Sequence, residues 1–165
     1  MLVPLLIGLS LSTGSPFADP DAPYPRVRAV TPLVQSLISN AAGRSLTVRH
    51  LMSRLAVTDV IVYVEQSGSS AIPIARTKLV ATSGGVRFLR IGIHAAVPFH
   101  DVAPMLAHEL QHAVEIAEEP SVVDDDGVRR LYHRIGRALG GDRYETGAAQ
   151  QIEARVRREL RTGGG

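Results

Sequence analysis

Residues 101–118 read DVAPMLAHELQHAVEIAE, and their apolar side chains recur at the spacing of an amphipathic helix. Asp101 is a candidate N-cap, and we expect the helix to run to about Glu118. Side chains three or four positions apart share one helix face. One arc carries the apolar residues Val102, Leu106, Leu110, Ala113 and Ala117. The opposite arc carries Met105, His108, His112 and Glu115. The helix therefore has one face for a hydrophobic core and a separate face that bears two histidines.

The string HELQH at residues 108–112 matches the pattern His-Glu-x-x-His. His108 and His112 are one helical turn apart, so both imidazoles point the same way and can bind one zinc ion. Glu109, on the same helix, is the candidate general base, which takes a proton from water and passes it to the leaving amine. The motif is short enough to occur by chance, so the alternative is a solvated helix with two surface histidines.

A zinc site for hydrolysis needs a third protein ligand and an open position, and three glutamates are candidates. Glu118 lies where the metzincin pattern places a ligand, but Glu115 stands where that pattern requires glycine, so we set Glu118 aside. Glu115 lies on the correct face, roughly 7 Å along the helix axis from the midpoint of the histidines. We therefore expect Glu115 to be hydrogen bonded to a ligand histidine, with direct metal binding as its alternative role.

Glu145 is the third candidate ligand and the one that the sequence favours. We expect a last helix from about residue 144 to 160, with an inward stripe that Glu145 extends. The stripe consists of Ala149, Ile152 and Val156. A carboxylate facing a core is costly unless it is paired, protonated or bound to a metal. The alternative is a solvated glutamate in the first turn, where it favours the helix dipole.

The rest of the chain predicts further helices and a small sheet. We expect helices at 32–43 and 45–56, a buried strand at 59–65, and a helix at 123–139 that ends at Gly140-Gly141. Residues 75–82 and 86–94 flank Ser83-Gly84-Gly85 and predict a β-hairpin. The order of helices, strands and helices predicts an α+β fold, with the hairpin packed on the histidine-bearing helix and on the C-terminal helices.

The first residues have the pattern of a secretory signal peptide. The run from Leu2 to Leu11 is apolar and shorter than the roughly 20 residues that span a bilayer. Small residues follow at Ser12, Gly14 and Ser15, although no basic residue precedes the run. We therefore predict a signal peptide at 1–18 and a single domain at 19–162. The mature protein would be periplasmic or secreted, with no stable membrane insertion.

Composition excludes several classes of function. The chain has 165 residues and no cysteine, which excludes disulfides, zinc ribbons and thiol catalysis. Aromatic residues make up 4% and the net charge is +2, so we expect no nucleic-acid partner. The acidic run at 124–126 lacks EF-hand spacing and is expected to be solvated. The sequence does not indicate an oligomeric state.

The motif with a later glutamate resembles the gluzincin branch of zinc metallopeptidases. Many gluzincins carry this glutamate in an E-x-x-A-D string, whereas residues 145–149 read ETGAA. Ala149 thus stands where the family has an aspartate that orients a ligand histidine, and Glu115 is the candidate substitute. The string HELQHAVEIAE at 108–118 also resembles small, uncharacterised, exported bacterial proteins of zincin type. The resemblance covers residues 105–160.

The resemblance implies a compact zincin-like domain that hydrolyses peptides or proteins. Zn²⁺ would be held by His108, His112 and Glu145, and Glu109 would act as general base and then as acid. Gluzincins also use a tyrosine or histidine to stabilise the oxyanion, and Tyr132 is the candidate here, with core packing as its alternative role.

A strand such as 86–94 could pair with the extended peptide substrate of such a peptidase. Two further hypotheses remain open beside a peptidase. The first alternative is a zincin-derived protein that binds metal or acts as a scaffold without turnover. The second is an α+β module that binds no metal, and it predicts no change in stability when a chelator is added.

Overall fold

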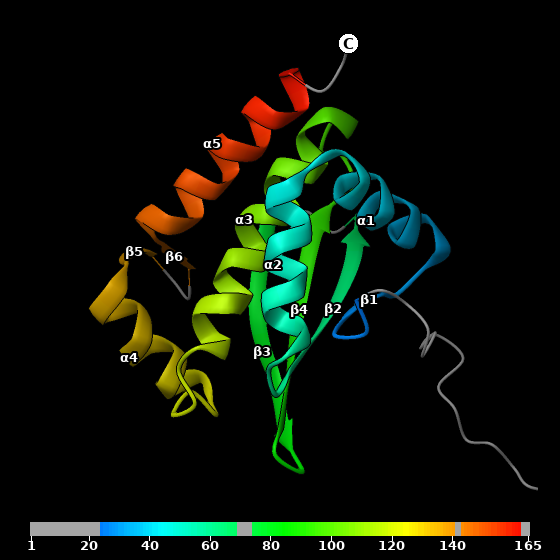
Figure 1. The fold of residues 1–165 in the computed structure, drawn as a ribbon. Coiled ribbons are helices and arrows are strands. Elements are labelled where there is room, and N and C mark those ends of the chain that lie inside the picture. The colour runs from blue at the N-terminus through cyan, green and yellow to red at the C-terminus, as the bar shows by residue number, and fades with distance from the viewer. Residues whose placement is uncertain (1–23, 69–73, 141–142, 163–165) are drawn as a thin grey trace, which may run out of the picture.

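The computed structural model describes residues 24–68, 74–140 and 143–162, and it confirms the α+β fold (Figure 1). The elements in chain order are β1 (Val27–Ala29), α1 (Pro32–Arg44), α2 (Leu46–Ala56), β2 (Val60–Ser67), β3 (Ala75–Ser83), β4 (Val86–His94), α3 (Phe99–Ala117), α4 (Asp125–Ile135), β5 (Arg137–Gly140), β6 (Arg143–Glu145) and α5 (Gly147–Thr162). The predicted signal peptide lies outside the described residues. Within them, no helix is both long and apolar enough to cross a membrane.

The main sheet has the strand order β1-β2-β4-β3. β1, β2 and β4 run parallel, and β3 is antiparallel to β4 at one edge. The predicted hairpin is therefore present as β3 and β4. Its turn has φ values of 56° at Gly84 and 75° at Gly85, a backbone conformation that favours glycine.

Helix α3 packs against the sheet with the face that the sequence predicts. Figure 1 shows α1, α2 and α3 on one face of the sheet, with α4 and α5 beside α3. The five residues of the predicted apolar arc of α3 are all buried. Asp101 is not the N-cap, because α3 begins two residues earlier, after Pro98, and Asp101 instead forms an ion pair with Arg157.

The C-terminal third differs from the prediction. The helix expected at 123–139 ends at Ile135, and the chain then forms the β5–β6 hairpin. Gly136 has an extended backbone and lies close to β6. A Cβ at this position would lie 2.8 Å from the carbonyl oxygen of Glu145, so any residue other than glycine would clash there. Glu145 therefore ends a strand and does not extend the stripe of α5. The strands β1, β5 and β6 are three or four residues long, too short to produce a periodic pattern.

Arg87 is a buried cation that joins β4 to the end of α3. Arg87 is only 1% exposed. Its Nη2 and Nε atoms donate to the two carboxylate oxygens of Asp59 at 2.6 and 2.8 Å, which makes a bidentate ion pair. Its guanidinium also donates to the carbonyl oxygens of Ile116, Ala117, Glu119 and Val122. These carbonyls lie at and beyond the C-terminus of α3, where the helix itself provides no donors. Arg87 thus holds this end of the helix against the sheet.

Candidate metal centre

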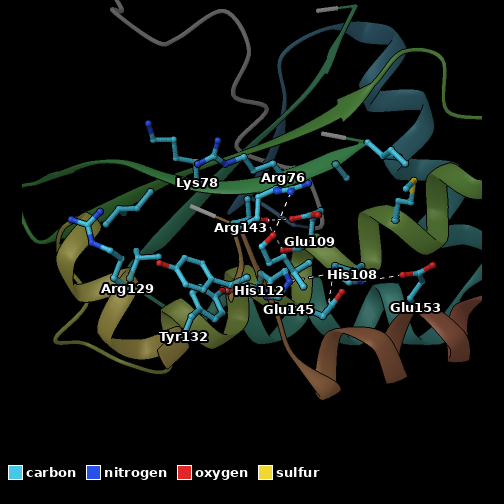
Figure 2. A pocket seen from close by; sticks show the side chains of 18 of the residues that line it. Arg76, Lys78, His108, Glu109, His112, Arg129, Tyr132, Arg143, Glu145 and Glu153 are labelled. Atoms are coloured by element: carbon cyan, nitrogen blue, oxygen red, sulfur yellow. Dashed lines mark hydrogen bonds and ion pairs between the residues drawn. The ribbon is translucent and has the colours of Figure 1, made fainter. Parts of the chain in front are cut away.

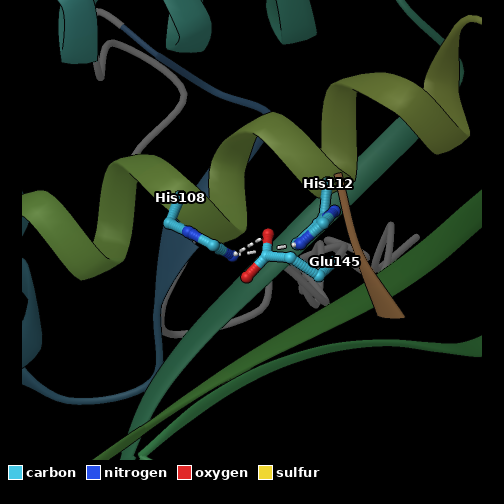
Figure 3. Close-up of side chains that lie close together, drawn as sticks. All are labelled: His108, His112 and Glu145. Carbon is cyan, nitrogen blue, oxygen red and sulfur yellow. Dashed lines mark hydrogen bonds and ion pairs between the residues drawn. The ribbon is translucent and has the colours of Figure 1, made fainter. Parts of the chain in front are cut away.

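His108 and His112 project from one side of α3 toward Glu145, which reaches them from β6 (Figure 3). The two Nε2 atoms are 3.2 Å apart, and Glu145 Oε1 lies 3.5 Å from His108 Nε2. The ligand atoms of the three side chains all lie within 4.8 Å of one another. The structure thus brings together the three residues that the sequence selects as metal ligands.

The donor set and its spacing fit a zinc ion. Two imidazole nitrogens and one carboxylate oxygen form a set that zinc uses in catalytic sites, which leaves one position open. Ligand atoms at about 2.0–2.1 Å from a tetrahedral zinc are about 3.4 Å from one another. The separations of 3.2 and 3.5 Å are close to this value, and the ligand atoms of the third pair, His112 and Glu145, lie within 4.8 Å of each other. The sequence predicted Glu145 in a helix, whereas the structure places it at the end of β6.

Each histidine is held by a carboxylate at its other ring nitrogen. His112 Nδ1 lies 2.9 Å from Glu115 Oε2, and His108 Nδ1 lies 3.0 Å from Glu153 Oε2. A carboxylate at Nδ1 keeps the proton on that nitrogen and leaves Nε2 as the ligand atom. Glu115 therefore occupies the orienting position that the sequence predicts, and its carboxylate lies against His112 Nδ1 rather than Nε2.

Glu153 is a functional candidate that the sequence analysis missed. It lies on α5 one turn after Ala149, the position where the resemblance expects an aspartate. The spacing of four residues, which returns to the same helix face, is the signal that could have identified it. Glu153 is itself bound by Arg157, whose Nη2 lies 2.9 Å from Glu153 Oε1.

A hydrogen-bond network also fixes Glu115. The Thr146 hydroxyl donates to Glu115 Oε1 at 2.7 Å, and Gln111 Nε2 lies 3.4 Å from the same oxygen. Burial alone would raise the pKa of Glu115, but the hydrogen bond with His112 and the other donors lower it. For His112, burial favours the neutral ring, but the carboxylates of Glu115 and Glu109 outweigh this effect and raise its pKa. Glu115 is therefore an ionised acceptor that holds the His112 ring in place.

Glu109 lies beside the histidines in a buried position, with 6% of its surface exposed. The Thr77 hydroxyl, on β3, is 2.7 Å from Glu109 Oε2 and 3.0 Å from the Glu109 carbonyl oxygen. Burial raises the pKa of Glu109, against the opposing effects of His112 and Thr77. A carboxylate with a raised pKa is a better acceptor of a proton near neutral pH. Sequence reasoning did not find Thr77, because the contact joins residues that are far apart in the chain.

These side chains line a pocket of about 440 Å³ (Figure 2). Its walls come from β3, α3, α4, β5, β6 and α5. β3 is the edge of the main sheet and faces this pocket, whereas β4 is paired on both sides, with β2 and β3. The expectation that the strand at 86–94 pairs with a peptide is therefore wrong, because its backbone groups are already used in the sheet. Among the described strands that line the pocket, β3 is the one at the edge of the main sheet.

Tyr132 lines the same pocket, and its ring is packed between other rings. Tyr132 is 4% exposed and stacks on Tyr144 with ring centroids 5.0 Å apart. Its ring also meets His112 edge-on at 5.4 Å, and its hydroxyl donates to the His112 carbonyl oxygen at 3.3 Å. Burial and the nearby Glu115 raise the pKa of Tyr132 well above its usual value. Its hydroxyl therefore stays protonated and supports the backbone of α3.

Other candidates lie away from this centre. Glu118, set aside above, is exposed and forms an ion pair with Arg54. Asp124 caps α4, since its Oδ1 accepts from Gly127 N at 2.7 Å, which gives the start of the acidic run a structural role. Among the described residues, the pocket lining includes no histidine besides His108 and His112.

Comparisons of the chain with protein-family models, with curated proteins and with solved structures find no match. The resemblance to gluzincins therefore rests on the motif alone. The functional conclusion has to be drawn from the geometry of the site.

Proposed function

We propose that this protein is an exported, zinc-dependent peptidase that cuts peptide bonds in extended segments. One observation carries the proposal: the ligand atoms of His108, His112 and Glu145 converge within 4.8 Å, beside the buried carboxylate of Glu109. The carboxylates at both Nδ1 atoms support it, because they orient the two rings for metal binding.

His108, His112 and Glu145 would hold the zinc ion in this site. When bound, the metal supplies a Lewis acid that polarises the scissile carbonyl and makes water a stronger nucleophile. Glu109 accepts the proton of the attacking water at its carboxylate and then donates it to the leaving amine. The Thr77 hydroxyl fixes the rotamer of Glu109, so the carboxylate is oriented before substrate binds.

The exposed edge of β3 supports a peptide as the substrate. An extended peptide can add to an open sheet edge through main-chain hydrogen bonds, while pockets beside the edge select its side chains. β3 provides both features, because none of the described strands pairs with its outer edge and its residues line the pocket. A peptide bound there would pass in front of α3, with its backbone near Glu109.

Metal content tests the proposal. We expect one zinc per chain in purified wild-type protein, no stoichiometric zinc in His112→Ala, and weaker zinc binding by about 10- to 100-fold or more in Glu145→Ala. His133→Ala and Glu118→Ala remove the same side chains at exposed sites outside the pocket and should keep the zinc. Elemental mass spectrometry after dialysis and a competitive chelator titration measure these values. A wild-type protein that takes up no zinc when it is offered would rule out the site.

Tyr132→Phe tests whether the tyrosine takes part in the chemistry. Its hydroxyl donates to the backbone of α3, so we expect kcat/KM to fall by less than about fivefold, equivalent to the loss of one ordinary hydrogen bond. The assay is steady-state hydrolysis by zinc-loaded protein. A loss of 100-fold or more in kcat with an unchanged KM would instead assign Tyr132 to oxyanion stabilisation.

A further inference from the structure

Thr146 joins the third candidate ligand to the start of α5. It follows Glu145, the last residue of β6, and precedes Gly147, the first residue of α5. Only 3% of its surface is exposed. Its backbone N–H donates to Glu145 Oε1 at 3.0 Å, and the same oxygen lies 3.5 Å from His108 Nε2. The N–H of Thr146 therefore keeps the Glu145 carboxylate turned toward the histidines, and the second lone pair of that oxygen stays available.

The hydroxyl of Thr146 makes two further hydrogen bonds. It accepts from the Ala149 N–H at 3.1 Å and so caps the N-terminus of α5. It donates to Glu115 Oε1 at 2.7 Å, across 31 positions of the chain. A hydroxyl has one proton and two lone pairs, so it forms both bonds at the same time. An ordinary N-cap needs only the first of these bonds, whereas the second ties the start of α5 to α3.

The bond from Thr146 holds the Glu115 oxygen that does not face His112. Glu115 Oε2 lies 2.9 Å from His112 Nδ1, whereas Oε1 accepts the proton of the Thr146 hydroxyl. The carboxylate is thus held at both oxygens, by side chains from two different parts of the fold. A carboxylate held in this way cannot rotate freely, so it fixes the orientation of the His112 ring.

We infer that Thr146 is a positioning residue of the metal centre, which places the third ligand relative to His112. This inference rests on the proposed zinc site. The two histidines lie on α3 and Glu145 lies on β6, so the ligand set forms only where these two elements keep their relative position. Thr146 contacts both sides, because its N–H binds the ligand from β6 and its hydroxyl binds the carboxylate that orients the ligand from α3. A binding site has to hold its groups within about 0.5 Å of the productive geometry.

Two substitutions separate the hydroxyl from the size of the side chain. Thr146→Val has nearly the same shape but no hydroxyl, whereas Thr146→Ser keeps the hydroxyl. We expect the zinc dissociation constant to rise by about 10- to 100-fold in Thr146→Val and to stay within about threefold of wild type in Thr146→Ser, since partners that orient metal ligands contribute in this range. A competitive chelator titration measures both constants. A Thr146→Val protein that binds zinc as tightly as wild type would overturn the inference.

Thr31→Val is the matched control for the loss of a helix cap. Thr31 is the N-cap of α1, and its hydroxyl accepts from the Val34 N–H at 3.3 Å. The residue is exposed and lies outside the pocket lining. Its substitution should lower the stability of the fold and leave the zinc dissociation constant unchanged. Equal losses of zinc affinity in Thr31→Val and Thr146→Val would show that a missing cap explains the effect, and the inference would fail.

A double-mutant cycle tests whether the hydroxyl acts through Glu115. Glu115→Ala removes the carboxylate that orients His112, and the Thr146 hydroxyl then has no carboxylate to hold. We therefore expect Thr146→Val to weaken zinc binding by less than about threefold when it is added to Glu115→Ala, because residues that act as a unit are not additive. If the two losses multiply instead, Thr146 does not act through Glu115, and the assignment is wrong.

A measurement on the metal-free protein makes the test independent of zinc. The proton on His112 Nδ1 exchanges slowly with water only while Glu115 holds it, so its NMR signal reports on this hydrogen bond. We expect exchange at least about tenfold faster in Thr146→Val and an unchanged rate in Thr146→Ser. The Nδ1 proton of His108 is the internal reference, because its partner Glu153 is held by Arg157.

The two kinds of measurement distinguish a failure of the inference from a failure of the proposed function. If wild type takes up no zinc, the proposed function fails, and the exchange rate at His112 still decides whether Thr146 positions this ring. Unchanged exchange in Thr146→Val would overturn the inference, and it would leave the zinc site standing if wild type binds the metal.

Discussion

Replacing Glu109 by Gln is expected to lower kcat/KM by about 10²- to 10⁴-fold, the range that a general acid-base group contributes. Gln has the same shape, and its amide oxygen can still accept the hydrogen bond from Thr77. The ligand atoms of His108, His112 and Glu145 are untouched, so zinc should remain at one per chain. The amide cannot take a proton from water, however, and the reaction would lose its base. Steady-state hydrolysis, with zinc content measured on the same samples, tests this result.

The matched control for this substitution is Glu118→Gln. Glu118 follows the last residue of α3, is exposed, and pairs with Arg54. The same chemical change there should alter kcat/KM by less than about twofold, since exposed ion pairs contribute little. If wild type and Glu109→Gln both bind zinc but neither hydrolyses a broad peptide library, the protein is a metal-binding or scaffold protein rather than a peptidase.

The sequence predicted the parts of the site that lie on one helix. The arcs of α3 follow from the helical repeat, so the buried face, the two histidines and Glu109 could all be assigned from spacing alone. Glu115 could be placed for the same reason, because it is three residues from His112 on the same helix. The relative positions of these residues depend only on the geometry of one helix, which the spacing in the sequence determines.

The parts that the sequence did not predict depend on contacts between distant elements. Thr77 meets Glu109 across 32 positions, and Glu153 meets His108 across 45. Glu145 reaches the histidines because the chain turns back in the β5–β6 hairpin, whose short strands resemble the end of a helix in sequence. The choice of β3 as the edge strand likewise depends on topology, since β2 pairs in parallel with β4 and leaves β3 outside. No periodic pattern within either strand encodes this order.

Replacing Arg87 by Met is expected to lower the free energy of unfolding by about 3–5 kcal/mol, mainly because several buried carbonyl oxygens lose their donor, while the Asp59 side chain is 43% exposed and stays partly solvated. Met has a similar length but no donors, so the carbonyl oxygens of Ile116, Ala117 and Val122 would lose their hydrogen bonds. A buried carbonyl without a donor costs about 1–3 kcal/mol. A loss of this size is a large part of the 5–15 kcal/mol that stabilises a typical domain. Urea unfolding at neutral pH measures it.

Arg90→Met, on the same strand, is the control for this change. Arg90 is exposed, and its contact with Glu65 is 3.8 Å long, so we expect a change within about 0.5 kcal/mol. The stability of Arg87→Lys should lie between those of Arg87→Met and Arg90→Met. An ammonium keeps the charge but cannot reach both oxygens of Asp59 and the carbonyls together. Equal stabilities of Arg87→Met and Arg90→Met would show that Arg87 does not hold the end of α3.

The pH dependence of stability gives the Arg87 prediction a second, independent signature. The hydrogen bonds and charge of Arg87 lower the pKa of Asp59 in the folded protein. In acid, Asp59 therefore binds protons more readily in the unfolded chain than in the folded protein. The stability that this carboxylate contributes is fully present above its unfolded pKa, and it is lost as the pH falls through its folded pKa. In Arg87→Met the two pKa values come closer, so the loss of stability between neutral pH and acid should be smaller than in wild type. These measurements require a fixed chelator concentration, because zinc bound at the proposed site would stabilise the folded state and add its own contribution.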